Sequence, residues 1–269
     1  MINRKGARKA AQIPDEVMIL LQSGQIPTVN LAEWLAVNHF SLLRHIVEEL
    51  ELQARYERMR ANLEKAAENK IMKIIPAIAK EWLTLLNELP PKDAEHVFAG
   101  LASHPSDSVR CWAAYIVGLD ERLSLEQKLQ RIRPFAADGH FGVREIAWMA
   151  VRESVSGEID AAIRMLHSWA QDEDANIRRF AIESIRPQGV WAKHIPQLKE
   201  APEKALSLLE LVKSDPAKYV QDSVSNWLND ASKMRPEWVR QVCEAWQLTS
   251  NTKETKRIVT RAQRSLNRA

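Results

Sequence analysis

Glycine, cysteine and long apolar runs are all scarce in this sequence. Glycine accounts for only 8 of the 269 residues, and runs of β-branched residues are few. Ala, Leu, Glu, Lys and Arg dominate instead, and these residue types favour helices. The composition therefore predicts an all-α protein. The length is sufficient for one large domain or a short array of repeats.

The two cysteines, Cys111 and Cys243, lie far apart and form neither a CxxC pair nor a metal-ligand spacing. We expect both to be packed thiols in a reducing compartment. No apolar run reaches the ~18 residues that a membrane helix needs. The basic N-terminus also lacks the apolar segment of a secretory signal. The simplest interpretation is a soluble intracellular protein that does not contact a membrane.

Charge is distributed unevenly along the chain, although the formal net charge is only +3. Residues 1–12 carry four lysines and arginines and no acid, which predicts a mobile basic arm before a single repeat domain over residues 13–269. Residues 13–177 carry 17 basic residues against 25 acids, and residues 178–269 carry 17 against 10. A basic C-terminal third suits a nucleic-acid surface, because Lys and Arg bind phosphates. Plain solubility explains the charge equally well.

Four segments share a valine or isoleucine followed by Arg or Gln and then by small and apolar residues at helical spacing. They are Val109-Arg110, Val143-Arg144, Ile177-Arg178 and Val220-Gln221. Acids stand upstream of each, and the basic positions are 34, 34 and 43 residues apart. The 34-residue step also fits a tetratricopeptide repeat, but the Trp, Leu-Gly and Tyr positions of that pattern are missing. The pattern is typical of HEAT repeats and predicts a HEAT-like α-α solenoid.

The third interval is nine residues longer than the others, and the surplus falls at residues 186–196. Insertions in a stacked array become loops, often on the binding face. Residues two, three, six and seven positions after the shared Arg or Gln are mostly apolar, which predicts the buried stripe of each helix. Glu183 and Asp230 lie on a neighbouring stripe. We expect these two acids on the same side of consecutive repeats, facing one groove.

Two carboxylates, the lone Trp191 and a group of basic residues would have a chemical use on one surface. The basic side chains would hold a sugar-phosphate backbone. Glu183 and Asp230 would each repel phosphate, so they make sense only where positive charge develops. Cleavage of a glycosidic bond creates an oxocarbenium-like sugar that a carboxylate stabilises. An alkylated purine is itself cationic and is attracted to the face of a tryptophan.

Structural explanations of the same residues stay open at this point. Glu183 fits an ion pair with Arg179 or Arg186, Trp191 fits a loop packed on the core, and Asp230 fits a helix end. Basic residues of HEAT repeats such as Arg178 often pair with acids of the neighbouring repeat. Spacing alone therefore leaves nucleic-acid binding and protein binding undecided.

Two motifs in these segments resemble a known family. Residues 177–192 read I-R-R-F-A-I-E-S-I-R-P-Q-G-V-W-A, similar to R-R-x-A-S-E-G-x-R-P-x-x-P-W-A. Residues 219–233 read Y-V-Q-D-S-V-S-N-W-L-N-D-A-S-K, similar to Y-V-x-x-S-V-A-N-x-L-N-D-x-x-K. A weaker likeness lies in residues 50–55, L-E-L-Q-A-R. The sequence thus resembles the AlkC/AlkD superfamily of bacterial DNA alkylation-repair glycosylases, and the AlkC branch more closely.

This resemblance implies a HEAT-like superhelix that holds duplex DNA in a concave groove and excises cationic bases such as 3-methyladenine and 7-methylguanine. It implies no metal and no organic cofactor, and the lesion need not be flipped into a pocket. Glu183 and Asp230 would be the catalytic carboxylates, and Trp191 would contact the lesion or its sugar. The implied DNA-backbone contacts are Arg178, Arg179, Arg186, Lys193, Lys218 and Lys233. We expect a monomer in the bacterial cytoplasm, associated with the nucleoid when bound to DNA that contains alkylated bases.

The sequence departs from the family pattern at several positions. Ser-Glu-Gly of the family is Ile-Glu-Ser at residues 182–184, and Leu-Pro-Trp is Gly-Val-Trp at residues 189–191. His140 stands where the AlkC branch tends to have an acid, which leaves Glu145 or Glu153 as a substitute. Two alternatives therefore remain. One is a DNA-binding paralogue for branched or distorted DNA that does not excise alkylated bases, and the other is a HEAT-repeat scaffold for a protein partner.

Overall fold

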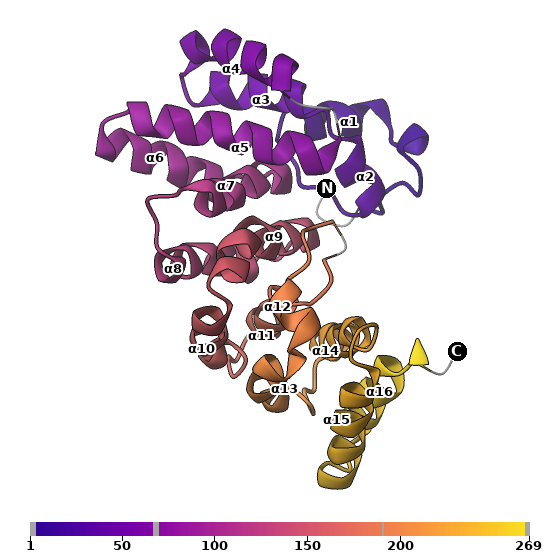
Figure 1. Ribbon diagram of the computed structural model, residues 1–269. Helices are drawn as coiled ribbons and strands as arrows, with labels where there is room; N and C mark the ends of the chain where they lie inside the picture. Colours follow the sequence, from indigo (N-terminus) through magenta and orange to yellow (C-terminus); the bar gives the residue numbers. More distant parts are fainter. Residues whose placement is uncertain (1–3, 67–69, 190, 267–269) are drawn as a thin grey trace. The chain divides into compact units, whose positions relative to one another are not determined.

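Residues 4–66, 70–189 and 191–266 are described by the computed structural model, and within these ranges the chain is built from helices and turns without a strand (Figure 1). No helix in these ranges is long and apolar enough to cross a membrane. The all-α class predicted from composition is confirmed. Both cysteines are buried free thiols, also as predicted.

The chain forms two compact units. The first unit comprises Met1–Arg122 and Gly139–Ala150, and the second comprises Leu123–Asp138 and Val151–Ala269. Helix α9, Phe141–Gly157, contributes residues to both units. The single repeat domain expected over residues 13–269 stays a prediction.

The first unit begins with short helices and continues with longer ones. In order they are η1 (Ala10–Gln12), α1 (Asp15–Gln22), α2 (Leu31–Ala36), α3 (His39–Glu49), α4 (Gln53–Ala66), α5 (Ile71–Glu88), α6 (Pro91–Ala102) and α7 (Asp107–Leu119). Asn30 and the apolar positions at helical spacing from Leu31 to Leu50 predict a single helix, but the structure has two, α2 and α3. The Asn30 side chain caps α2 by accepting from the Glu33 N–H, and Asn38 caps α3 by accepting from Phe40 and Ser41.

The described part of the basic arm contacts residues 27–33 of the same unit. Arg4 pairs with the carboxylate of Glu33 and donates to the carbonyl of Pro27. The Asn30 amide donates to the carbonyl of Ala7 over 2.9 Å. Residues 1–3 lie outside the described ranges, and the mobility of the arm stays a prediction.

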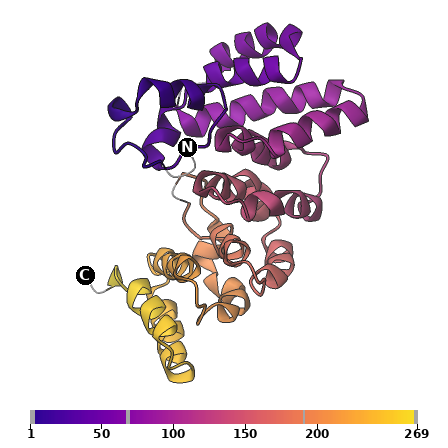
Figure 2. The same ribbon diagram turned by 180° about the vertical axis from the view of Figure 1, so that it is seen from behind.

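The second unit contains the C-terminal helices. Besides the end of α9 these are α8 (Leu125–Ala136), α10 (Ile159–Trp169), α11 (Ala175–Glu183), α12 (Pro196–Glu200), η2 (Pro202–Ala205), α13 (Leu206–Leu211), α14 (Lys218–Ala231), α15 (Pro236–Thr249) and α16 (Lys253–Ala262). Helix α14 lies between α11 and α16 and packs against both (Figures 1 and 2). This packing brings the two motifs together. Residues 177–189 and 191–192 form most of α11 and of the loop after it, and residues 219–233 form most of α14.

The four predicted repeat segments are the helices α7, α9, α11 and α14, and their apolar stripe is buried as expected. The stripe residues are at most 8% exposed and include Trp112, Ile146, Phe180 and Trp227. Arg178 of α11 donates twice to Asp215, the acid before α14, over 2.6 and 3.0 Å. This ion pair between successive repeat segments is the structural role that HEAT repeats give to such an arginine.

Candidate active site

Glu183 and Asp230 lie on adjacent helices of the second unit. Glu183 is the last residue of α11 and is 3% exposed, and Asp230 is in the last turn of α14 and is 6% exposed. Both positions follow from the helical periodicity, which puts each acid on the stripe beside the buried face. Carboxylates are seldom this buried unless they are paired, so their partners determine what the pair can do.

Arg186 joins the two carboxylates. Its Nη1 donates to Glu183 Oε1 over 2.6 Å, while Nε and Nη2 both donate to Asp230 Oδ2 over 2.9 and 2.7 Å. The Arg186 side chain is only 12% exposed. Arg186, for which the resemblance implies a DNA-backbone contact, holds both candidate catalytic acids on one guanidinium.

The second oxygen of Glu183 has its own partners. Ser223 of α14 donates its hydroxyl to Glu183 Oε2 over 2.6 Å, and Arg179 Nη2 lies 3.6 Å from the same oxygen. The Arg179 guanidinium in turn lies 4.7 Å above the ring of Tyr219. Ser223 and Tyr219 stand in the second motif, so the motif carries a signal for both residues beside Asp230.

These contacts keep the Glu183 carboxyl ionised. Burial by itself raises the pKa of Glu183, but the charges of Arg179 and Arg186 and the hydrogen bonds from Ser223 and Arg186 outweigh it, so the pKa lies below 4.5. Burial likewise lowers the pKa of Arg186, and the charges of Glu183 and Asp230 more than offset this effect. At neutral pH the ionised carboxylate of Glu183 is buried and fixed by cations, and a carboxylate fixed in this way can stabilise a positive charge that develops beside it.

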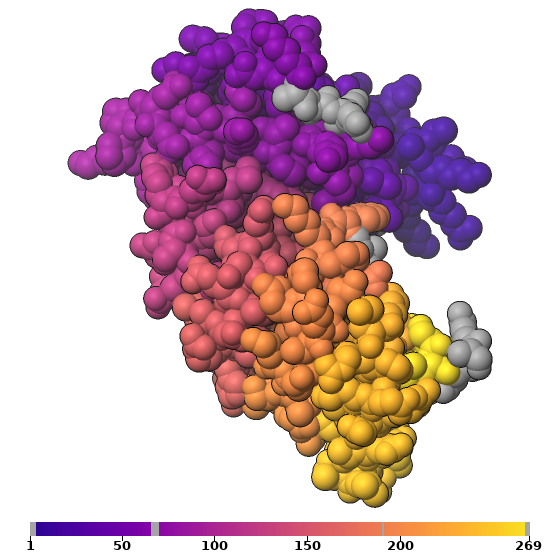
Figure 3. Space-filling model, viewed as in Figure 1, coloured from indigo at the N-terminus to yellow at the C-terminus, as the bar shows by residue number. Residues whose placement is uncertain are grey.

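Trp191 lies on the loop between α11 and α12, in the nine surplus residues of the repeat. Its side chain is 58% exposed, so it is not packed on the core. The Ile195 N–H donates to the Pro187 carbonyl over 3.0 Å and closes the loop. A Cβ on Gly189 would lie 2.3 Å from the carbonyl oxygen of Ala192, so only glycine fits this close approach. The orange segment that contains α12 is on the surface in Figure 3.

The three lysines expected to contact the DNA backbone are exposed. Lys233 donates to Gln188 on the loop over 2.7 Å and lies 3.4 Å from Asp230 Oδ1. Lys193 is 84% exposed and pairs with Glu153. Lys218 is exposed at the start of α14. The three predicted arginines differ from them, because Arg178, Arg179 and Arg186 are at most 14% exposed and pair with carboxylates.

His140 and its two possible substitutes as a third acid, Glu145 and Glu153, occupy different places. His140 belongs to the first unit, where its Nε2 lies 2.9 Å from the Thr28 carbonyl and its Nδ1 3.4 Å from Asp107. Glu145 accepts from the indole of Trp148 over 2.8 Å. Glu153 is 85% exposed beside Lys193. Of these, only Glu153 shares a unit with Glu183 and Asp230.

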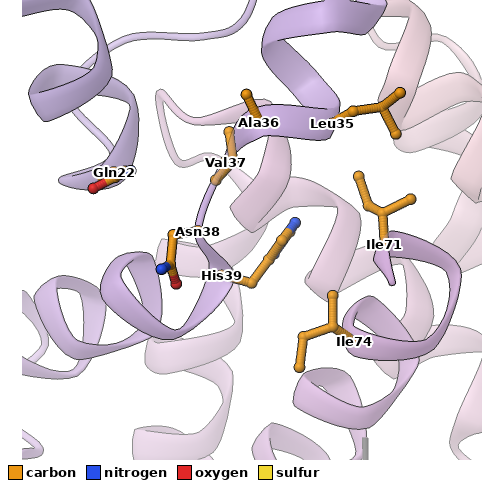
Figure 4. A pocket seen from close by; sticks show the side chains of 8 residues that line it. All are labelled: Gln22, Leu35, Ala36, Val37, Asn38, His39, Ile71 and Ile74. Carbon is orange, nitrogen blue, oxygen red and sulfur yellow. The ribbon is translucent and has the colours of Figure 1, made fainter. Parts of the chain in front are cut away.

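A separate pocket of about 290 Å³ lies in the first unit. Figure 4 shows its lining: Gln22, Leu35, Ala36, Val37, Asn38, His39, Ile71 and Ile74. His39 is 2% exposed, and burial lowers its pKa to about 4. Its Nδ1 accepts from the Trp112 indole over 3.1 Å, and its buried Nε2 has no hydrogen-bond partner among the described residues. The lining contains neither a carboxylate nor a basic side chain beyond this neutral imidazole, so the cluster of the second unit is the better candidate for chemistry.

No group of three His, Cys, Asp or Glu residues within the described ranges is placed to hold a metal ion.

Known proteins share both sequence and fold with this chain. A stretch of 97 residues is 38% identical to the uncharacterized protein YhaZ of Bacillus subtilis (strain 168). This stretch covers 36% of this chain and 27% of YhaZ. The alkylpurine DNA glycosylase AlkC of Pseudomonas fluorescens, solved with DNA containing an abasic site analog, is similar in structure with a TM-score of 0.68 and 20% identity. That likeness covers 97% of this chain and 66% of the AlkC chain.

AlkD2 of Streptococcus mutans matches with a TM-score of 0.56 and 23% identity over 69% of this chain and 87% of its own. The protein smu.31 of S. mutans UA159 matches with a TM-score of 0.58 and 21% identity. That match covers 81% of this chain and 98% of smu.31. At these identities the solved structures establish the helical-repeat fold, as the resemblance to the AlkC/AlkD superfamily implied. The sequence pattern of the family described as DNA alkylation repair enzyme matches residues 74–262, more than half of the chain. The chain therefore belongs to the family of DNA alkylation repair enzymes.

Proposed function

We propose that this protein is a DNA glycosylase that binds duplex DNA and hydrolyses the N-glycosidic bond of cationic alkylated purines such as 3-methyladenine and 7-methylguanine. The observation that carries the proposal is the pair of almost buried carboxylates, Glu183 and Asp230, held by one guanidinium beside a loop with an exposed tryptophan. The family and the likeness to an alkylpurine DNA glycosylase support it.

Anionic carboxylates suit this reaction because positive charge moves to the sugar as the bond breaks. An alkylated purine is already cationic and leaves as a neutral base, so no general acid has to protonate it. Glu183 or Asp230 stabilises the oxocarbenium-like sugar and accepts a proton from the attacking water. The carboxylate of Glu183 is available for this role at neutral pH, because its pKa is held below 4.5.

Arg186 makes the acids compatible with DNA. Two free carboxylates would repel phosphates, whereas the cluster of Glu183 and Asp230 with Arg179 and Arg186 has no net charge, and Lys233 adds a positive one. Trp191 supplies an exposed ring that attracts the cationic base. Exposed Lys193, Lys218 and Lys233 provide the phosphate contacts, and Arg178, Arg179 and Arg186, which pair with carboxylates, are further contacts. The protein acts as a monomer in the bacterial cytoplasm, at the nucleoid when bound to DNA.

Release of 3-methyladenine from methylated duplex DNA tests the proposal. Glu183→Gln and Asp230→Asn keep the shape of each side chain and remove its charge, and we expect each to slow single-turnover release on the order of 100-fold. Glu237→Gln is the matched control, because Glu237 is an exposed acid of the same unit. Release at the wild-type rate by both site variants would show that the catalytic assignment is wrong.

A DNA-binding function without base excision is the second candidate. The pairing of both acids with Arg186 favours it, because the same contacts would serve a purely structural cluster. Wild-type protein that releases no base but binds DNA with a steep salt dependence would support this alternative. Binding that does not weaken with salt, or no binding at all, would favour a scaffold for a protein partner.

A further inference from the structure

Arg152 of α9 is a buried arginine that holds both ends of the loop on which Trp191 lies. Its Nη1 donates to the Ser184 carbonyl over 3.0 Å, Nη2 to the Arg186 carbonyl over 2.6 Å, and Nε to the Lys193 carbonyl over 2.7 Å. The first two carbonyls precede the loop turn, and the third follows Trp191. One guanidinium thus fixes the width of the loop at its base.

The charge of Arg152 is buried, and the loop carbonyls that accept its hydrogen bonds replace part of its lost hydration. Arg152 is 3% exposed. Burial and the nearby charge of Arg186 lower its pKa to about 10, and the acids Glu183 and Asp230 offset only part of this effect. The guanidinium therefore stays charged at neutral pH, and a charged donor makes strong hydrogen bonds to the loop carbonyls.

The repeat register shows what Arg152 replaces. Eight residues after the shared Arg or Gln stand Gly118, Arg152, Arg186 and Asn229. A Cβ on Gly118 would lie 2.1 Å from the Ala150 carbonyl oxygen, so α7 and α9 meet there backbone to backbone. Ser184 is the counterpart of Ala150 in the next segment, six residues after the shared Arg. Between α9 and α11, the Arg152 guanidinium takes the place of the direct backbone contact that Gly118 makes between α7 and α9. One of its donors binds the Ser184 carbonyl, and the other two bind the carbonyls of Arg186 and Lys193.

We infer that Arg152 is a positioning residue for the proposed excision reaction. It fixes residues 184–189 and 191–193 so that Trp191 is presented to DNA and the backbone of Arg186 is held where its side chain meets Glu183 and Asp230. It does this through the carbonyls that it binds and without touching the substrate. The effect of Arg152 on base excision rests on the proposed function. Its effect on the loop does not, because the three hydrogen bonds are present in the protein without DNA.

Hydrogen exchange of the protein without DNA tests the fixing of the loop. In Arg152→Met, which has similar bulk and no donors, we expect amides of residues 186–195, including the bonded Ile195 N–H, to exchange at least about tenfold faster, while α15 is unchanged. Arg152→Lys should behave like Arg152→Met, because one ammonium does not span three carbonyls. The control is Arg110→Met in the first unit, where Arg110 also donates to two carbonyls, those of His104 and Pro105. An unchanged exchange rate in the loop would overturn the inference.

Single-turnover excision tests the consequence. Arg152→Met should slow base release on the order of 100-fold and leave the Kd for undamaged duplex within about twofold, since phosphate contacts carry that affinity. In a Trp191→Ala background, Arg152→Met should reduce the rate of base release by a much smaller factor, because the loop then has no aromatic ring to present. Equal fold losses in both backgrounds would contradict the positioning role.

Two further outcomes are distinguishable. If wild-type protein releases no base, the proposed function fails, and the exchange experiment still decides whether Arg152 fixes the loop. If Arg152→Met does not fold, Gly189→Ala disturbs the same loop from its other side, because the added Cβ would meet Ala192. We expect it to reproduce the faster exchange at residues 186–195 and the slower release, and wild-type values for both would count against the inference.

Discussion

Arg186 determines the state of both candidate catalytic acids, and its removal should be costly for stability. Arg186→Met leaves two nearly buried carboxylates without their shared cation, and losing one partner of a buried ion pair costs about 3 kcal/mol. Urea unfolding at pH 7 measures this loss. Arg240→Met is the control, because its partner Glu237 is 76% exposed and such a pair contributes less than about 1 kcal/mol.

Adding Glu183→Gln and Asp230→Asn to Arg186→Met should restore part of the lost stability, because the uncompensated negative charges are then gone. If Arg186→Met costs no more than Arg240→Met, the two acids do not depend on this guanidinium and the electrostatic account of the cluster is wrong.

His39 should make the protein less stable as the pH falls below neutrality. Its pKa is about 4 in the folded protein against 6.5 in the unfolded chain. Between these values the unfolded chain binds a proton that the folded protein does not, so stability is full above pH 6.5 and is lost as the pH falls. The expected decrease between pH 7 and pH 5 is about 2 kcal/mol.

Unfolding free energies of the wild type and His39→Gln at these two pH values test the effect. The variant should lose the pH-dependent part, and His45→Gln, at an exposed histidine, should retain it. Glu183 acts at lower pH, because its folded pKa lies below 4.5 and its contribution is lost only as the pH falls below the unfolded value. An equal pH slope in wild type and His39→Gln would contradict the assignment.

At the scale of helices, the sequence predicted the repeat segments well because their signals are local. The buried stripe and the helix starts depend on residues within one or two turns. The division between α2 and α3 was missed, although its signal is present, because Asn38 has the side chain of an N-cap. The apolar residues on both sides of Asn38 fit one helical period and so predict one helix. The Asn38 side chain nevertheless caps a new helix, and the chain divides there.

The candidate site was predictable in its members and not in its contacts. Glu183, Asp230 and Trp191 follow from motif and spacing, but Arg186 reaches Asp230 across 44 residues of sequence and Arg152 reaches Arg186 across 34. Such contacts depend on how neighbouring helices pack, which one sequence does not encode in any short window. Arg152 in particular looked like an ordinary position near the end of a helix.

At the scale of the whole molecule, DNA binding by the second unit should depend on its exposed lysines. Lys218 begins the α14 face that continues through Asp222 and Asn226 to Asp230, since these residues are four apart. Lys193→Gln, Lys218→Gln and Lys233→Gln should each weaken duplex binding and reduce the slope of log K against log salt by about 0.9, the value for one released phosphate counterion. Fluorescence anisotropy over a series of salt concentrations measures this slope.

Lys204→Gln is the matched control, because Lys204 is a partly exposed lysine of the same unit that pairs with Asp160 of α10, away from the two motifs. Its slope should equal that of the wild type. If Lys204→Gln changes the slope as much as Lys218→Gln does, DNA binding depends on the total charge of the unit and not on lysines at the face of α14. A backbone path along α14 would then be wrong, and Glu183 and Asp230 would lose the neighbouring phosphate contacts that bring a lesion to them.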